Sequence, residues 1–88
     1  MSDELVQRVL KVIATSKRIP LESVTVDSAF QDLGIDSMDA VEILFGLENE
    51  FDINIPDDDV RSVRDVRGMC EGVERLVLAK SAAPQTGQ

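Results

Sequence analysis

The residues best placed for chemistry lie in one stretch of the chain, LGIDSMDAVEIL at residues 33–44. Ser37 stands there between two acids, at the point where a turn gives way to a helical pattern. A serine nucleophile needs a neighbouring base, and the sequence has no histidine and no lysine close to Ser37. The hydroxyl is therefore not expected to act as a nucleophile on its own, and helix capping or covalent modification are the roles left to weigh.

Capping is the simpler role for a polar residue at a helix start. If Asp36 is the N-cap, however, Ser37 occupies the first helical position, where its hydroxyl points to solvent and is not needed for the cap. The free N–H groups and the dipole of the helix start can then hold a phosphate attached to that oxygen. Asp36 and Asp39 would repel such a phosphate, which indicates that they serve another purpose, recognition by a basic partner. Taken alone, an exposed serine is more often unmodified, so a helical interaction protein stays an alternative.

Metal and thiol chemistry find less support in the sequence. The acidic run Asp57-Asp58-Asp59 lacks the alternating D-x-D-x-D-G spacing and the closing glutamate of a calcium loop. An acidic calcium-binding module is therefore a weaker alternative, and no metal site is predicted. Cys70, the single cysteine, cannot form an internal disulfide. Its place on an apolar stripe predicts a small core residue and not a reactive thiol.

Length and charge limit the class of protein. A chain of 88 residues suits one domain with a small core, predicted over residues 1–80, and the small, polar residues 81–88 are predicted to be a disordered tail. The net charge is -8, and every charged residue between Ile19 and Val60 is acidic. Such a surface disfavours nucleic acid and favours a partner with a basic patch. No apolar run approaches the roughly 20 residues of a membrane span, so no stable membrane insertion is expected. The single cysteine, and an N-terminal stretch without the basic start and apolar run of a signal peptide, favour a cytoplasmic protein, which we expect to be a monomer.

Helical periodicity identifies the elements that position these residues. Apolar residues at steps of three and four predict a first helix over residues 3–17, followed by a long connection with one turn of helix around Glu22. The second helix is predicted to begin after Asp36 and to end at residue 50 or 51. A short third helix follows over residues 57 to about 61.

The fourth helix has two candidate starts. Ser62 with Asp65 would form a capping box, whereas Asp65 alone as N-cap places the apolar residues that follow on one stripe. We favour Asp65. No strand pattern and no repeat appears, so the predicted fold is all-α: a small four-helix bundle with three longer helices, a short third helix and a long connection between the first two.

The second helix carries two apolar stripes when its residues are placed at steps of 100°. One stripe is about as wide as a core-facing surface and consists of Ala40, Ile43, Leu44, Leu47 and Phe51. Met38, Val41 and Phe45 form the other, with acids along its edges. A helix packed on both sides would explain the second stripe, but buried, unpaired acids are costly. We therefore expect this stripe to be exposed and to bind a partner whose hydrophobic groove is ringed by basic residues.

Two sequence blocks resemble a known family. Residues 34–38, GIDSM, are similar to the motif G-x-D-S-L, and residues 48–57, ENEFDINIPD, are similar to E-x-E-F-x-x-x-I-P-D. At their mutual spacing, and with this length and charge, the blocks resemble the acyl carrier proteins of fatty-acid and polyketide synthesis. The resemblance extends from the first helix to about Leu78.

The resemblance implies a carrier protein and not an enzyme. Ser37 would bear 4′-phosphopantetheine through a phosphodiester, donated by coenzyme A through a phosphopantetheinyl transferase, and the thiol of this arm would hold acyl intermediates as thioesters. Acyl synthases and transferases with basic docking patches would bind the second helix at Asp36, Met38, Asp39, Val41, Glu42, Phe45 and Glu48. The acyl chain would be sheltered between the helices by Ile43, Leu47, Ile55 and Val63.

The cargo is open to more than one interpretation. Met38 replaces the usual leucine and Phe45 a usual aliphatic residue, while the fourth helix, with Gly68 and Gly72, differs from the primary fatty-acid carriers. The change at Met38 is conservative, and Phe45 bears on partner choice or chain access. The fourth helix favours a carrier for a specialised lipid or a secondary metabolite. A carrier of aminoacyl or peptidyl groups is the alternative, although the acid before Ser37 is more typical of acyl carriers, because peptidyl carriers often have histidine there.

Overall fold

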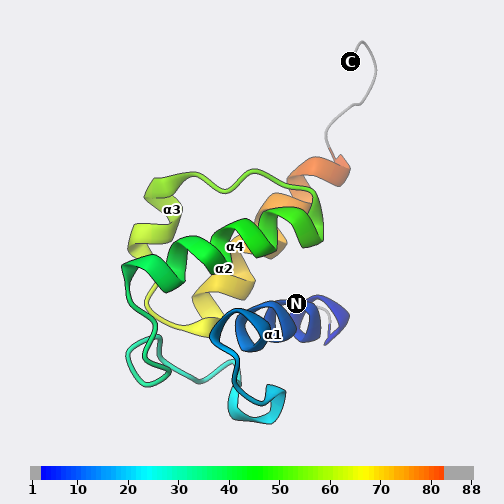
Figure 1. Cartoon of the computed structure of the whole chain (residues 1–88). Coiled ribbons are helices and arrows are strands. Elements are labelled where there is room, and N and C mark those ends of the chain that lie inside the picture. The colour runs from blue at the N-terminus through cyan, green and yellow to red at the C-terminus, as the bar shows by residue number, and fades with distance from the viewer. Residues whose placement is uncertain (1–2, 83–88) are drawn as a thin grey trace.

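The computed structural model describes residues 3–82, apart from the side chains of residues 57, 59, 60, 81 and 82. The elements follow the order α1 (Asp3–Lys17), the 3-10 turn η1 (Leu21–Ser23), α2 (Ser37–Phe51), α3 (Asp57–Ser62) and α4 (Val66–Ala82) (Figure 1). In the part of the chain described, the β-type pairing is limited to an isolated bridge between Ala29 and Asp65. The predicted all-α class is confirmed.

The ends of the helices agree closely with the sequence pattern. α1 has the predicted bounds, and α2 ends at Phe51. Of the two candidate starts for α4, the structure has Asp65 as the cap, since its Oδ1 accepts the N–H of Gly68 at 2.8 Å. α4 continues past the predicted domain boundary at Lys80 to Ala82. Residues 83–88, where most of the disordered tail was predicted, lie outside the described residues.

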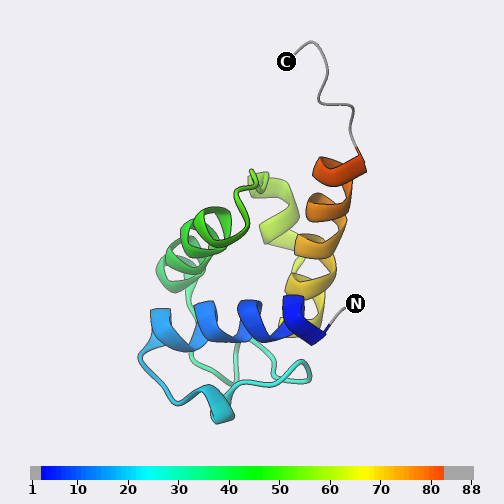
Figure 2. The ribbon, with the colours of Figure 1, turned by 90° about the vertical axis from the view of Figure 1, so that its right-hand side faces the viewer.

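α1 is the helix on which the other long helices are assembled. Both α2 and α4 pack against it, and α3 lies between α2 and α4 (Figure 2). An aliphatic core forms where these surfaces meet. Its largest fully buried side chains are Ile13, Ile43, Leu47, Val9, Val66, Val73 and Cys70. Burying an aliphatic side chain of this size stabilises the fold by about 1.5–3 kcal/mol, so α1 is held mainly by apolar contacts.

Polar contacts hold the C-terminal end of α2. Arg8 of α1 donates from Nε to Glu50 Oε2 and from Nη2 to the Glu50 carbonyl oxygen, both at 2.8 Å. Its guanidinium also lies 4.3 Å from the centre of the Phe51 ring. Lys80 of α4 donates to the carbonyl and carboxylate oxygens of Asp52, at 2.6 and 2.8 Å. These cations lie where the helix dipole favours positive charge.

The connection between α1 and α2 is fastened to the start of α4. Phe30 N–H donates to the Arg64 carbonyl oxygen, and Val66 N–H donates to the Ser28 carbonyl oxygen, each at 3.0 Å. These bonds flank the bridge between Ala29 and Asp65. The segment that leads into α2 is therefore held beside the link between α3 and α4.

In the part of the chain described, no helix combines the length and the apolar character needed to cross a bilayer.

Gly46 marks the closest approach of α1 and α2. A Cβ atom at this position would lie 2.8 Å from Val12 Cγ1, whereas a Cβ atom at Gly72 in α4 would meet nothing within 4 Å. Valine is β-branched and has little rotamer freedom in a helix. An added methyl group at position 46 would therefore force the two helices apart, and one at position 72 would not.

We expect Gly46→Ala to lower the free energy of unfolding by about 1 kcal/mol, because overpacking of about 1–3 kcal/mol outweighs a helix-propensity gain of about 1 kcal/mol. Gly72→Ala, the matched control, should raise it by up to about 1 kcal/mol. Urea denaturation of both variants measures the difference. Adding Val12→Ala to Gly46→Ala removes the clashing methyl group. Equal stabilisation by both glycine substitutions would contradict a rigid contact at Gly46.

Candidate functional site

Ser37 is the first residue of α2, and the cap before it is Asp36 as predicted. Asp36 Oδ1 accepts the N–H of Asp39 at 2.9 Å, and Asp39 Oδ2 accepts the N–H of Asp36 at 3.3 Å, so the two acids close a capping box. Gly34 enters this turn with φ of 71°, a backbone conformation that suits glycine. The Ser37 side chain is exposed, and within the described residues its hydroxyl makes no hydrogen bond. The hydroxyl is therefore available for another purpose.

Lys17 fixes the turn before Ser37 to the end of α1. Its Nζ donates to the Gly34 carbonyl oxygen at 3.0 Å and to Asp39 Oδ2 at 2.7 Å. The bond from Lys17, and next the capping bond with Asp36, lower the pKa of Asp39 below its ordinary value of 3.8. The sequence had indicated no lysine near this helix start, and the fold brings one there. An ion-paired ammonium has no lone pair, however, so Lys17 is not a base for Ser37.

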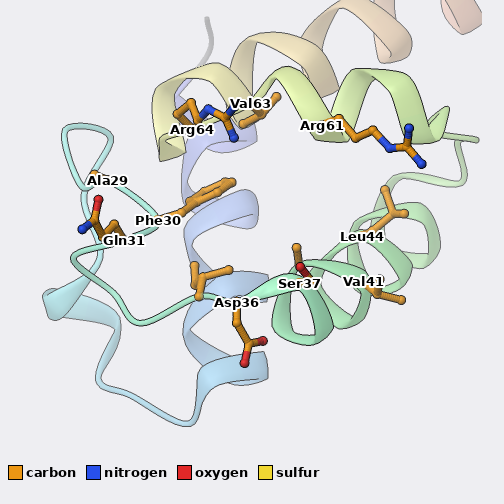
Figure 3. Close-up of a pocket in the computed structure, with 12 residues that line it drawn as sticks. Ala29, Phe30, Gln31, Asp36, Ser37, Val41, Leu44, Arg61, Val63 and Arg64 are labelled. Atoms are coloured by element: carbon orange, nitrogen blue, oxygen red, sulfur yellow. The ribbon is translucent and has the colours of Figure 1, made fainter.

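An open groove of about 1040 Å³ begins beside Ser37. We call it the Ser37 groove. It lies between the first half of α2, the connection at residues 29–35 and residues 61–64 (Figure 3). Its lining consists of Ala29, Phe30, Gln31, Ile35, Asp36, Ser37, Ala40, Val41, Leu44, Arg61, Val63 and Arg64. Most of these side chains are apolar, and the charged ones divide by sign, with Asp36 on the α2 side and the two arginines opposite.

The residues predicted to shelter an acyl chain lie in two environments. Val63 lines the Ser37 groove, while Ile43 and Leu47 are fully buried in the core and Ile55 packs against the core from a half-buried position. The structure thus brings together Ser37 and Val63 but keeps the other three outside the groove lining. Sequence reasoning missed Ile35, Arg61 and Arg64. The signal available for the arginines was the change of charge sign after Val60.

The predicted recognition residues divide into exposed and engaged side chains. Met38, Val41 and Phe45 are 76%, 46% and 58% exposed, which confirms the second apolar stripe as a surface feature. Glu42 is exposed beside them. Glu48, in contrast, is half-buried and accepts the N–H of Ile55 at 2.9 Å through Oε2. Together with the capping roles of Asp36 and Asp39, this contact gives three of the four predicted acids an intramolecular function.

The two other candidate sites are the thiol of Cys70 and the acidic run at residues 57–59. Cys70 is fully buried, as predicted, and burial raises the pKa of its thiol to about 11, so the reactive thiolate is scarce near neutral pH. Among the side chains that are described, no group of three or more acids or cysteines is arranged to hold a metal ion. The side chains of residues 57 and 59 are outside that set.

The similarity to known proteins extends well beyond the short motifs around Ser37. A family model described as "Phosphopantetheine attachment site" matches residues 4–73. An acyl carrier protein of Rickettsia bellii (strain RML369-C) is 40% identical over 65 residues, which are 73% of this chain and 76% of that protein. The chain belongs to the acyl carrier protein family.

Plant members of the family are similar over more of the chain. Acyl carrier protein 1, chloroplastic, of Casuarina glauca is 38% identical over 79 residues, and a chloroplastic acyl carrier protein of Brassica napus is 39% identical over 80 residues. The matches cover 89% and 88% of this chain but 58% of each plant protein. The shared region therefore corresponds to a part of the longer plant proteins.

Family membership makes this protein a carrier and not an enzyme, and its group is 4′-phosphopantetheine. The site geometry fits that group. An exposed hydroxyl begins a helix, the cap is supplied by another residue, and an open groove with apolar walls starts beside the hydroxyl. A carrier role does not require the protein to supply a catalytic base. The absence of histidine from the sequence is consistent with this role.

We expect Lys17→Met to raise the pKa of Asp39 towards its ordinary value, because the largest contribution to the lowered pKa is the bond from Lys17. A carboxyl with a lowered folded-state pKa adds stability above its unfolded pKa of about 3.9, and that stability is lost as the pH falls through the folded value. Lys17→Met should therefore flatten the loss of stability on acidification. Carboxyl NMR titration and denaturation at several pH values measure both effects.

Lys11→Met is the matched control, because Lys11 is an exposed lysine of α1. It should leave the titration of Asp39 unchanged. If Lys17→Met and Lys11→Met give the same Asp39 titration curve, the ion pair at the start of α2 does not form in solution.

Proposed function

We propose that Ser37 Oγ is the attachment point of the 4′-phosphopantetheine arm, on which this protein carries acyl groups between biosynthetic enzymes. When attached, the arm ends in a thiol that holds an acyl group as a thioester. The observation that supports Ser37 is its position: an exposed hydroxyl at the first residue of α2, freed from capping by Asp36 and opening on the Ser37 groove. Coenzyme A would donate the arm through a phosphopantetheinyl transferase.

The surface that partners bind would be the apolar stripe Met38, Val41 and Phe45 with its acidic border. These side chains are exposed on the helix that begins with Ser37, so a partner enzyme bound there would lie next to the arm. Among the described residues, Glu42 is the border acid without a structural contact to lose, since Asp36, Asp39 and Glu48 each accept a backbone N–H or a lysine ammonium. Acyl synthases and transferases with basic docking patches fit this chemistry.

The whole helical domain would serve to present the arm and to shelter its acyl chain. Residues 1–80 would form the carrier domain, a small four-helix bundle that acts as a monomer in the cytoplasm. The acyl chain would be sheltered from the Ser37 groove inwards, past Val63 and towards Ile43, Leu47 and Ile55. The apolar lining of the groove supports its use as the entrance. The departure of α4 from the primary fatty-acid carriers, with Gly68 and Gly72, supports a specialised lipid or a polyketide as cargo.

Attachment is tested by incubating the protein with coenzyme A and a broad-specificity phosphopantetheinyl transferase, followed by intact-mass measurement. Wild type should gain the mass of one phosphopantetheinyl group, and Ser37→Ala should gain none. Ser23→Ala, which removes another exposed serine, is the control and should be modified like wild type. Absence of the added mass from wild type, or equal gain by Ser37→Ala, would refute attachment at Ser37.

Docking is tested by the charge reversal Glu42→Lys. It should weaken binding of apo protein to the transferase by about two- to fivefold, the range of an exposed ion pair of about 0.5–1 kcal/mol, and should lessen the dependence of affinity on salt. Calorimetric titration at low and high NaCl measures both effects. Glu22→Lys makes the same charge change on η1, away from α2, and should bind like wild type. Equal weakening by both variants would indicate a response to net charge and not a docking surface.

A further inference from the structure

Two arginines face the Ser37 groove from the wall opposite Ser37. Arg61 lies in the last turn of α3, and Arg64 lies in the link between α3 and α4 (Figure 3). Both are exposed, and each lines the same groove as the Ser37 side chain. The groove thus has an acid and the attachment hydroxyl on one wall and two guanidinium groups on the other.

Neither arginine takes part in the ion pairs that hold the fold together. Arg8, Lys17, Arg67 and Lys80 each pair with an acid from a distant segment. Within the described residues, Arg61 and Arg64 make no such pair, although the chain carries 17 acids and 9 basic residues. Their guanidinium groups are therefore available to an anion that enters the groove.

The backbone that carries Arg64 is held in place. The Arg64 carbonyl oxygen accepts the N–H of Phe30 at 3.0 Å, next to the bridge between Ala29 and Asp65. Phe30 itself lines the Ser37 groove. The main chain of this wall is thus tied to the connection that leads into α2, and the wall keeps its place relative to Ser37.

We propose that Arg61 and Arg64 bind the phosphodiester that joins the arm to Ser37, which rests on the proposed function of that serine. A phosphodiester attached to Ser37 Oγ carries a negative charge at a known place, the mouth of the groove. Asp36 repels it from the α2 side, and the guanidinium groups attract it from the other. Arginine suits this role because its fork of N–H donors matches the oxygens of a phosphate group.

The two arginines would set the direction in which the arm leaves Ser37. Held by the arginines, the phosphodiester leans across the groove, so that the arm leaves Ser37 over the apolar lining formed by Phe30, Ile35 and Val63. Without them, the opposite wall would offer no positive charge to hold the phosphodiester across the groove. Arg61 and Arg64 are therefore positioning residues for the attached group.

The experiment compares apo and modified protein by NMR, with intact mass confirming modification. In wild type, the Nε–Hε resonances of Arg61 and Arg64 should shift on modification and return towards their apo positions as NaCl rises from about 20 to about 500 mM, because salt screens exposed charges. The Arg75 resonance, from an exposed arginine of α4, should not shift. Arg61→Gln with Arg64→Gln should move the ³¹P resonance of the modified protein, and Arg75→Gln should leave it at the wild-type position.

The outcomes separate this proposal from the attachment itself. If wild type gains no mass, no phosphodiester forms and both proposals are overturned. If the mass is gained but the resonances of Arg61 and Arg64 stay at their apo positions, the arginine contact is wrong and attachment stands. If these resonances shift only when the arm is loaded with an acyl group that ends in a carboxylate, the arginines bind the cargo, which also overturns the phosphodiester contact.

Discussion

The ammonium of Lys17, bound to the Gly34 carbonyl and to the Asp39 carboxylate, is the contact on which the geometry of the site depends. It joins the last turn of α1 to the first turn of α2. At the other end of the helix pair, Arg8 holds the last residues of α2. Since α1 therefore binds α2 at both ends, the two helices run antiparallel, and Gly46 allows them to approach closely between those contacts. The place of Ser37 in the molecule follows from this pairing.

The acidic residues between Ile19 and Val60 form a block without basic residues in the sequence, but they have different physical roles. Asp36 and Asp39 stabilise the start of α2, and Glu48 binds the backbone of the segment that follows it. Asp52 ends α2 in a left-handed conformation with φ of 54° and receives Lys80, which lowers the pKa of its carboxyl. Glu42 has no such contact with any residue that the structure describes. Of the four acids predicted to bind a partner at α2, three therefore also stabilise the fold of the carrier itself.

Local patterns were sufficient to predict the helices, the Asp36 cap and the exposure of Met38, Val41 and Phe45, because each depends on residues within one or two turns. The contacts of Lys17 with Asp39 and of Glu48 with Ile55 could not be predicted in this way, since they depend on how separate segments pack. The same holds for the groove wall with Arg61 and Arg64, which the pairing of Phe30 with Arg64 brings opposite Ser37. The sequence motif singled out Ser37 as the predicted attachment residue, whereas the residues that surround it could be located only in the folded structure.

The burial of Cys70 bears on the chemical fidelity of a carrier. A thioester exchanges readily with any accessible thiolate, so a surface cysteine on the carrier could take the acyl group onto its own side chain or form a mixed disulfide with the free arm. Cys70 is fully enclosed between the helices, and its thiol has a pKa of about 11. Both access and ionisation are thereby suppressed, and the protein's own sulfur does not compete for the group that it transports.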